Sequence, residues 1–70
     1  MNFNGQHLRD ARKAAGLTIA ELYRDSGVSI EIISRAERGK NVPNAEALAV
    51  LAGTLGVTME SLYDRDEVVA

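Results

Sequence analysis

Apolar residues recur about every three or four positions along most of this 70-residue chain. That spacing places them on one face of an α-helix, whereas a half-buried strand would need strict alternation of apolar and polar residues. No competing stretch of alternation is present. The pattern predicts an all-α fold of five short helices packed around one core. The clearest apolar stripe joins Ala45, Leu48, Leu51, Ala52 and Leu55, and an earlier one joins Leu8, Ala11 and Ala15.

Residues that start and stop helices mark the ends of these five elements. Side chains with oxygen atoms stand before each apolar stripe, where they can accept a hydrogen bond from a backbone amide of the first turn. Thr18 and Glu21 have the spacing of a capping box, in which each side chain bonds the other residue's amide. The second helix is expected to end near Asp25 and the third near Arg38. The expected caps are Asn4, Thr18, Ser29, Asn44 and Thr58, and the expected helix-ending glycines are Gly16, Gly27, Gly39 and Gly56.

The third helix has one apolar face and one hydrogen-bonding face when its residues are placed at intervals of about 100°. Ile33 and Ala36 point toward the core, and Val28 enters the core just before the helix. Ile30 and Ile32 fall on opposite flanks. The outward side holds Glu31, Ser34, Arg35 and Arg38.

Glu37 falls near the inward side of this helix, which is an unusual place for a carboxylate. A buried charge needs an oppositely charged partner. Arg12 lies near the inner face of the first helix. We therefore expect an Arg12–Glu37 ion pair that ties the first helix to the third.

Composition indicates one small domain without covalent or metal cross-links. Seventy residues are close to the lower limit for an independent core, and the absence of cysteine excludes disulfides and thiolate metal sites. No segment has the roughly 18 apolar residues of a membrane span. The first residues lack the basic start and apolar run of a signal peptide. We therefore expect a cytoplasmic protein that makes no membrane contact.

Charge divides the chain into a neutral body and an acidic tail. Residues 1–63 hold seven Lys or Arg and seven Asp or Glu, while residues 64–70 hold one Arg and three acids, so the net charge is −2. We expect a folded domain over residues 1–63 and an acidic tail over residues 64–70. The negative sum argues weakly against nucleic acid as a partner, but a neutral body can still carry a basic face.

The second helix, a three-residue turn and the third helix form a helix-turn-helix arrangement, in which the later helix enters the DNA major groove. Leu22, Gly27, Val28 and Ile33 hold the spacing of that motif, within the fragments GLT..EL, GVS...IS..ERGK..P and L..LA..LGV....L. Residues 8–62 resemble the phage repressor and Cro family, the XRE-type helix-turn-helix proteins. The resemblance implies a λ-repressor-like fold and sequence-specific binding to double-stranded operator DNA. It also implies a homodimer on an inverted repeat and repression of transcription.

The resemblance assigns roles to individual residues. The start of the third helix would meet base edges, and the helix starts and the loop would hold phosphates, where helix dipoles and free amides favour anions. The positions of Arg12 and Glu37 often carry an ion pair in the family. Base contacts are expected from Ser29, Ile30 and Glu31, with Ser34 and Arg35 one turn later, and phosphate contacts from Thr18, Lys40, Asn41 and Asn44. Ile19 and Arg38 complete the set of residues expected at the DNA interface.

The sequence departs from the family pattern in three places. Ile19 stands where glutamine is frequent, so one phosphate or supporting contact is lost. Tyr23 stands where alanine is usual, so its ring must swing outward or change the crossing of the second and third helices. Ile30, Glu31 and Ile32 replace polar readers, although Ile30 can meet a thymine methyl group and Glu31 a cytosine amino group. Glu31 also repels phosphate, which lowers affinity for non-specific DNA.

Three functions remain open on the sequence. The first is a DNA-binding transcriptional regulator. The second is a protein-interaction module of the same fold, which pairs with another regulator or a toxin through Ile30 and Ile32, and the third is the DNA-binding part of a longer protein. A solvated charged face is the plain alternative for Arg35, Arg38 and Lys40. Because no nucleophile–base pair, phosphate-binding glycine loop or metal cluster is evident, we expect no enzyme, cofactor, metal or small-molecule ligand.

Two further expectations concern the ends of the chain. His7 has no partner at ligand spacing and is expected to be an ordinary surface histidine. The fifth helix and the tail are the expected dimer surface, unless Val57 and Leu62 instead complete the monomer core. The candidate dimer residues are Val57, Met59, Leu62, Tyr63, Val68 and Val69.

Overall fold

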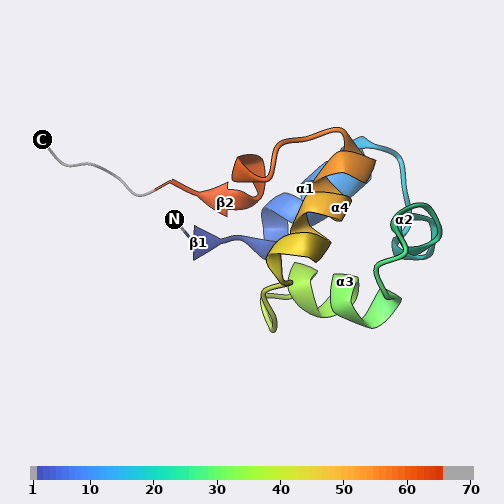
Figure 1. Cartoon of the computed structure of the whole chain (residues 1–70), viewed down its shortest axis with the longest axis horizontal. Helices are drawn as coiled ribbons and strands as arrows, with labels where there is room; N and C mark the ends of the chain where they lie inside the picture. The colour runs from blue at the N-terminus through green and yellow to red at the C-terminus, as the bar shows by residue number, and fades with distance from the viewer. Residues whose placement is uncertain (1, 66–70) are drawn as a thin grey trace, which may run out of the picture.

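Four α-helices enclose the core, and two short strands join the ends of the domain (Figure 1). The computed structural model describes residues 2–65. The strands β1 (Asn2–Phe3) and β2 (Tyr63–Asp64) pair antiparallel, and in Figure 1 they lie at the left, away from α2 at the right and α3 at the lower edge. The helices are α1 (Gly5–Ala14), α2 (Ile19–Ser26), α3 (Ile30–Glu37) and α4 (Ala45–Leu55), followed by a single 3-10 turn, η1 (Glu60–Leu62).

The predicted caps form at the start of all four α-helices. The side chains of Asn4, Ser29 and Asn44 each accept a hydrogen bond from a first-turn amide, at 2.9, 3.2 and 2.8 Å. The capping box closes in both directions. The Glu21 amide donates to the Thr18 hydroxyl at 3.1 Å, and the Thr18 amide donates to the Glu21 carboxylate at 2.9 Å. Local sequence therefore fixes where each α-helix begins.

The prediction of five helices is wrong at the last element. Thr58 does accept a hydrogen bond from the Ser61 amide at 3.2 Å, but the chain makes only η1 before it extends into β2. Tyr63 pairs there with Phe3, and the two rings meet edge to face with centroids 5.9 Å apart. Because each strand has only two residues, neither shows the alternation that announces a strand. The fold is therefore mostly helical, with four α-helices and a strand pair that the sequence pattern missed.

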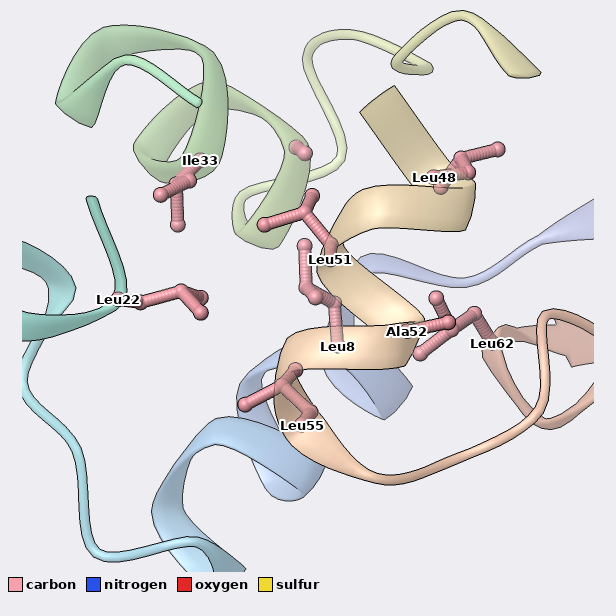
Figure 2. Packing of buried hydrophobic residues seen from close by; sticks show 9 residues of the cluster. Leu8, Leu22, Ile33, Leu48, Leu51, Ala52, Leu55 and Leu62 are labelled. Atoms are coloured by element: carbon pink, nitrogen blue, oxygen red, sulfur yellow. The ribbon is translucent and has the colours of Figure 1, made fainter. Parts of the chain in front are cut away.

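One cluster of buried apolar side chains holds the elements together (Figure 2). Every α-helix and η1 contributes to it, and Figure 2 shows Leu51 of α4 between Ile33 of α3 and Leu8 of α1. Ala15 and Ala45, which belong to the predicted stripes, are exposed because they lie at helix ends. The cluster consists of Leu8, Leu22, Ile33, Ala36, Leu48, Leu51, Ala52, Leu55 and Leu62.

The predicted ion pair between Arg12 and Glu37 is present and joins α1 to α3. Arg12 Nε donates to Glu37 Oε2 at 2.7 Å and Nη2 donates to Oε1 at 2.9 Å. Arg12 Nη1 also donates to the Leu17 carbonyl oxygen at 2.8 Å, so the guanidinium holds the segment after α1 as well. The hydrogen bond to Glu37 raises the pKa of Arg12 above its ordinary value. Both partners are buried and bonded at two points, as a buried charge requires.

Gly5 provides a second close contact between α1 and α3. It is the first residue of α1 and is buried against the end of α3. A Cβ atom at this position would overlap the Ala36 carbonyl oxygen and crowd the backbone of Glu37. Glycine therefore lets the two helices approach at backbone distance. Together with the Arg12–Glu37 pair, this contact fixes the direction in which the opposite side of α3 points.

Candidate nucleic-acid interface

α2, a three-residue turn over residues 27–29 and α3 form the helix-turn-helix. Gly27 adopts a left-handed conformation, with φ of 76°, and its amide donates to the Tyr23 carbonyl oxygen at 2.8 Å. Residues with a Cβ rarely adopt this conformation, so glycine suits the turn. The next amide, of Val28, donates to the Ser26 hydroxyl at 3.1 Å, and the Val28 side chain packs against the core. The turn is thus fixed by its own hydrogen bonds and by burial.

The side of α3 that faces away from the core carries the side chains predicted to meet bases. Ile30, Glu31 and Arg35 are exposed, and Ser34 lies half-buried beside them. We call these four residues the outer face of α3. Ser29 is also exposed at the start of the helix, where its hydroxyl caps α3. In Figure 1 this helix lies along the lower edge of the molecule.

Two ionised side chains of opposite sign meet on the outer face of α3. Arg35 Nη2 lies 3.1 Å from Glu31 Oε1, one helical turn away, and the two side chains remain 56% and 73% exposed. Arg38 lies beyond this pair, and its Nε donates to the Ser34 carbonyl oxygen at 3.3 Å. Lys40 is exposed in the loop that follows. The sequence placed Glu31 and Arg35 on one side of the helix but did not indicate that they pair.

The predicted phosphate contacts lie at the starts of α2 and α4 and in the loop before α4. Lys40, Asn41 and Asn44 are exposed there. Thr18 is exposed too, but its hydroxyl and amide are both bonded within the capping box. The bond from the Thr18 backbone lowers the pKa of Glu21, so the carboxylate stays ionised beside the first amides of α2. It therefore competes with phosphate for that helix end.

Ile19 and Tyr23, which depart from the family pattern, have different surroundings. Ile19 is half-buried and packs against the core, so it forms part of the apolar side of α2. Its side chain offers a phosphate no hydrogen bond. Tyr23 is 47% exposed, so its ring has swung outward, which is one of the two outcomes expected from the sequence.

A polar cluster around His7 joins the two ends of the described chain. His7 Nε2 lies 3.3 Å from Asp64 Oδ1, and its Nδ1 lies 3.2 Å from the Ser61 carbonyl oxygen. Asn4 Nδ2 donates to both carboxylate oxygens of Asp64 at 3.0 and 3.1 Å. His7 does lie at the surface, with its side chain 38% exposed, but folding gives it partners more than fifty positions away in the sequence. Asp64, which the charge pattern placed in the tail, is held to the domain by these bonds.

The residues predicted to form a dimer surface fall into separate environments. Leu62 is fully buried, and Val57 and Tyr63 pack half-buried against the core. Met59 is 36% exposed. Val57 and Leu62 thus complete the monomer core, which was the alternative that the sequence left open. The remaining two candidates, Val68 and Val69, lie outside the described residues.

No three His, Asp or Glu side chains within residues 2–65 gather in a way that could hold a metal ion. Among the helices of that same part of the chain, none combines the length and apolarity needed to cross a bilayer. The outer face of α3 and the neighbouring helix starts form one candidate site, because the exposed residues predicted to contact DNA lie there.

A family model described as helix-turn-helix matches residues 8–62. The chain belongs to the helix-turn-helix family. The matched segment runs from α1 to η1 and contains all nine residues of the buried cluster. The resemblance drawn from the three sequence fragments is thereby confirmed, since those fragments lie within the same segment.

Proteins similar to this helix-turn-helix chain include transcriptional regulators, and one similar solved structure is a complex with operator DNA. It is 38% identical over 61 residues to Rv0474 of Mycobacterium tuberculosis, an uncharacterized HTH-type transcriptional regulator, covering 87% of this chain and 44% of that protein. Among solved structures, the P22 c2 repressor in complex with a synthetic operator is similar with a TM-score of 0.82. That pair is 32% identical and the match covers 94% of this chain and all of the repressor chain.

A third similar structure is the SinR protein/SinI protein complex. Its matched chain has a TM-score of 0.81 and 30% identity, over 86% of this chain and 59% of that one. The helix-turn-helix chain described here spans less than half the length of Rv0474.

Proposed function

We propose that this helix-turn-helix chain is a sequence-specific DNA-binding regulator of transcription that inserts α3 into the major groove and acts as a repressor. The observation that carries the proposal is the outer face of α3. It is accessible and bears an acceptor, a cation and a hydroxyl, and it is held at a fixed angle by the buried Arg12–Glu37 pair and by Gly5. Side chains that read bases need this combination of access and rigid support.

In this proposal the helix starts position the protein on the phosphate backbone. Asn44 at the start of α4, with Lys40 and Asn41 in the preceding loop, would contact phosphates on one side of the groove. Thr18 would do so from the start of α2, where Glu21 weakens the contact. Such contacts orient α3 without carrying sequence information.

We further propose that two copies bind an inverted repeat with half-sites about one helical turn apart. The similarity to the P22 c2 repressor, whose structure is a complex with a synthetic operator, supports binding to operator DNA. The contacts between copies would come from the exposed part of the surface near Met59, or from further domains of a longer protein.

The test is a selection from a random duplex pool, followed by affinity measurements against salt for the enriched sequence and for scrambled DNA. We expect an inverted repeat and a log affinity that falls linearly with log salt concentration, as phosphate contacts require. Arg35→Ala should weaken binding to the enriched sequence at least tenfold. Arg9→Ala, which removes an exposed Arg from α1, is the matched control. Absence of any enriched sequence would count against the proposal.

A second candidate function is supported by exposed apolar side chains. Ile30 and Ile32 are 46% and 37% exposed, and Ile32 borders a shallow groove that also contains Val28, Ala47 and Val50. A protein partner would cover such a surface, and the SinR/SinI complex provides an example of protein binding by a similar fold. Substituting Ile30→Lys separates the two functions, because it should change the base preference of a DNA reader but abolish a protein complex.

A further inference from the structure

The ion pair between Glu31 and Arg35 is the most informative feature of the outer face of α3. Arg35 Nη2 and Glu31 Oε1 are 3.1 Å apart, and both side chains are largely exposed. Exposed ion pairs one turn apart add little to the stability of a fold. The buried side of the same helix is already held by Arg12 and Glu37. The exposed pair therefore matters mainly for whatever approaches this surface.

Within α3, which the structure describes completely, few side chains can read a base by hydrogen bonding. Ile30 and Ile32 are apolar, and Ser34 is half-buried. Glu31 and Arg35 are the two exposed side chains of this helix that carry hydrogen-bonding groups. Polar readout from α3 thus depends on these two residues, and they are in contact with each other.

We propose that Glu31 and Arg35 act as one reading unit for a guanine with a cytosine in the same or the adjacent base pair. This inference rests on the proposed function. Arg35 has paired N–H donors that match the O6 and N7 acceptors of guanine. The ionised carboxylate of Glu31 only accepts hydrogen bonds, and the cytosine amino group is its preferred donor in the major groove.

Contact between the two side chains limits which bases they can meet together. A guanidinium and a carboxylate that touch each other must bind base atoms that are also neighbours. Guanine O6 and the cytosine amino group are neighbours within one base pair, and successive base pairs are separated by about 3.4 Å. Glu31 therefore acts as a positioning residue that aims Arg35 as well as a direct reader of cytosine.

Glu31 has a second effect because the domain carries no excess positive charge. Residues 2–65 contain eight Lys or Arg and eight Asp or Glu, which sum to zero. Non-specific affinity depends on cations that replace counterions along the phosphates. The Glu31 carboxylate repels phosphates and lowers that affinity further. This loss of affinity is offset only where a cytosine amino group donates a hydrogen bond to the carboxylate.

The experiment compares selections from random duplex pools by the 70-residue chain and by its Glu31→Gln variant. The wild-type chain should enrich guanine beside cytosine in each half-site. In Glu31→Gln the preference for cytosine should fall at least tenfold and move toward adenine, which glutamine reads. The guanine preference at the neighbouring position should fall as well, because Arg35 has lost its positioning contact. Affinity for scrambled DNA should rise.

Matched variants separate the pair from a simple change of charge. Glu60→Gln removes the same charge from an exposed residue in η1 and should leave both base preferences intact. In a double-mutant cycle, Glu31→Ala and Arg35→Ala should each lose the guanine preference, with no further loss in the double variant. Circular dichroism should show that all variants keep the wild-type helix content.

The outcomes distinguish this inference from the proposed function. If the wild-type chain enriches a sequence and Glu31→Gln keeps both base preferences, the reading unit is wrong while DNA recognition stands. If only the cytosine preference changes, Glu31 and Arg35 read separately and the positioning role is wrong. If the wild-type chain enriches no sequence, both proposals are overturned.

Discussion

An Arg–Glu ion pair lies on each side of α3, and one pair is buried whereas the other is exposed to solvent. On the inner side, Arg12 and Glu37 have side chains that are 10% and 5% exposed, and they share two hydrogen bonds. On the outer side, Glu31 and Arg35 are mostly exposed and share one contact. The same chemistry therefore serves as a structural joint where water is excluded, and it stays available to a ligand where water is present.

Breaking the inner pair should produce the largest effect. Arg12→Ala and Glu37→Ala each leave a buried charge without its partner, so we expect each to destabilise the fold by about 3–5 kcal/mol. Urea unfolding followed by circular dichroism measures the loss. The double variant should lose less than the sum of the two single variants. Unchanged thermal stability in both single variants would show that the inner pair contributes no more than the outer one.

Gly5→Ala changes the contact between α1 and the inner side of α3 without changing any charge, so it tests packing there separately from the ion pair. The added methyl group overlaps the Ala36 carbonyl oxygen, so α1 must move away from α3. We expect a loss of about 1–3 kcal/mol, the usual cost of overpacking, and a weaker Arg12–Glu37 coupling in the same background. Gly53→Ala is the control, because a Cβ atom at that position in α4 meets no neighbouring atom. Equal stability of the two variants would contradict the close approach of α1 and α3.

Thr18→Ala tests a local contact that belongs to neither pair. It removes the hydroxyl that accepts the Glu21 amide, and the loss of a cap of this kind costs about 0.5–2 kcal/mol. Thermal unfolding should therefore show an intermediate effect. Thr54→Ala provides a comparison, since the Thr54 hydroxyl donates to the Val50 carbonyl within α4 and caps no helix start. A loss as large as that of Arg12→Ala would mean that the cap, rather than the inner pair, dominates stability.

Acid should weaken the same cap. The pKa of Glu21 is lowered in the folded protein, first by the hydrogen bond from the Thr18 backbone. A lowered pKa means that the ionised form is favoured by folding, so its stabilisation is present above the ordinary pKa of 4.5. It is lost as pH falls through the lower folded value. Thermal unfolding from pH 6 to pH 3 should show a steeper decline for the wild-type chain than for Glu21→Gln, and equal slopes would contradict this.

Breaking the outer pair should have the smallest effect on stability. Glu31→Ala and Arg35→Ala should each change the free energy of unfolding by at most about 0.5 kcal/mol, because exposed pairs are solvated. Urea unfolding beside the Arg12→Ala variant gives the contrast directly. A loss above about 2 kcal/mol would mean that the outer pair is a structural joint too, and its proposed role in reading DNA would lose its basis.

Much of the fold was predictable because helix starts, helix ends and apolar stripes depend on neighbours a few positions apart. Thr18 and Glu21, for example, form the capping box that their spacing predicts. The Arg12–Glu37 pair was predictable for a different reason, since a carboxylate on the inward side of a helix requires a cation nearby. The prediction of the last helix was wrong. Thr58 accepts a hydrogen bond from the Ser61 amide, but the chain extends after Leu62 and Tyr63 pairs with Phe3, a partner far away in the sequence.

The candidate site was predicted as a set of residues but not as a geometry. The sequence assigned Glu31 and Arg35 to one side of α3. Only the side-chain positions in the structure show that the two residues are in contact. Ile19 was counted among the DNA-contacting residues, yet it packs partly into the core. A position in a motif indicates which direction a side chain faces, whereas its partners depend on the neighbouring elements.

The sequence by itself determined where the four α-helices begin, the apolar cluster and the need for a buried cation beside Glu37. These features follow from hydrogen bonds and burial patterns within single helices, which depend on residues close in the chain. The tertiary structure alone decided the backbone approach at Gly5, the strand pair and the cluster of His7 with Asp64. Those contacts join segments far apart in sequence, and they form only when the packed core brings the segments to one place.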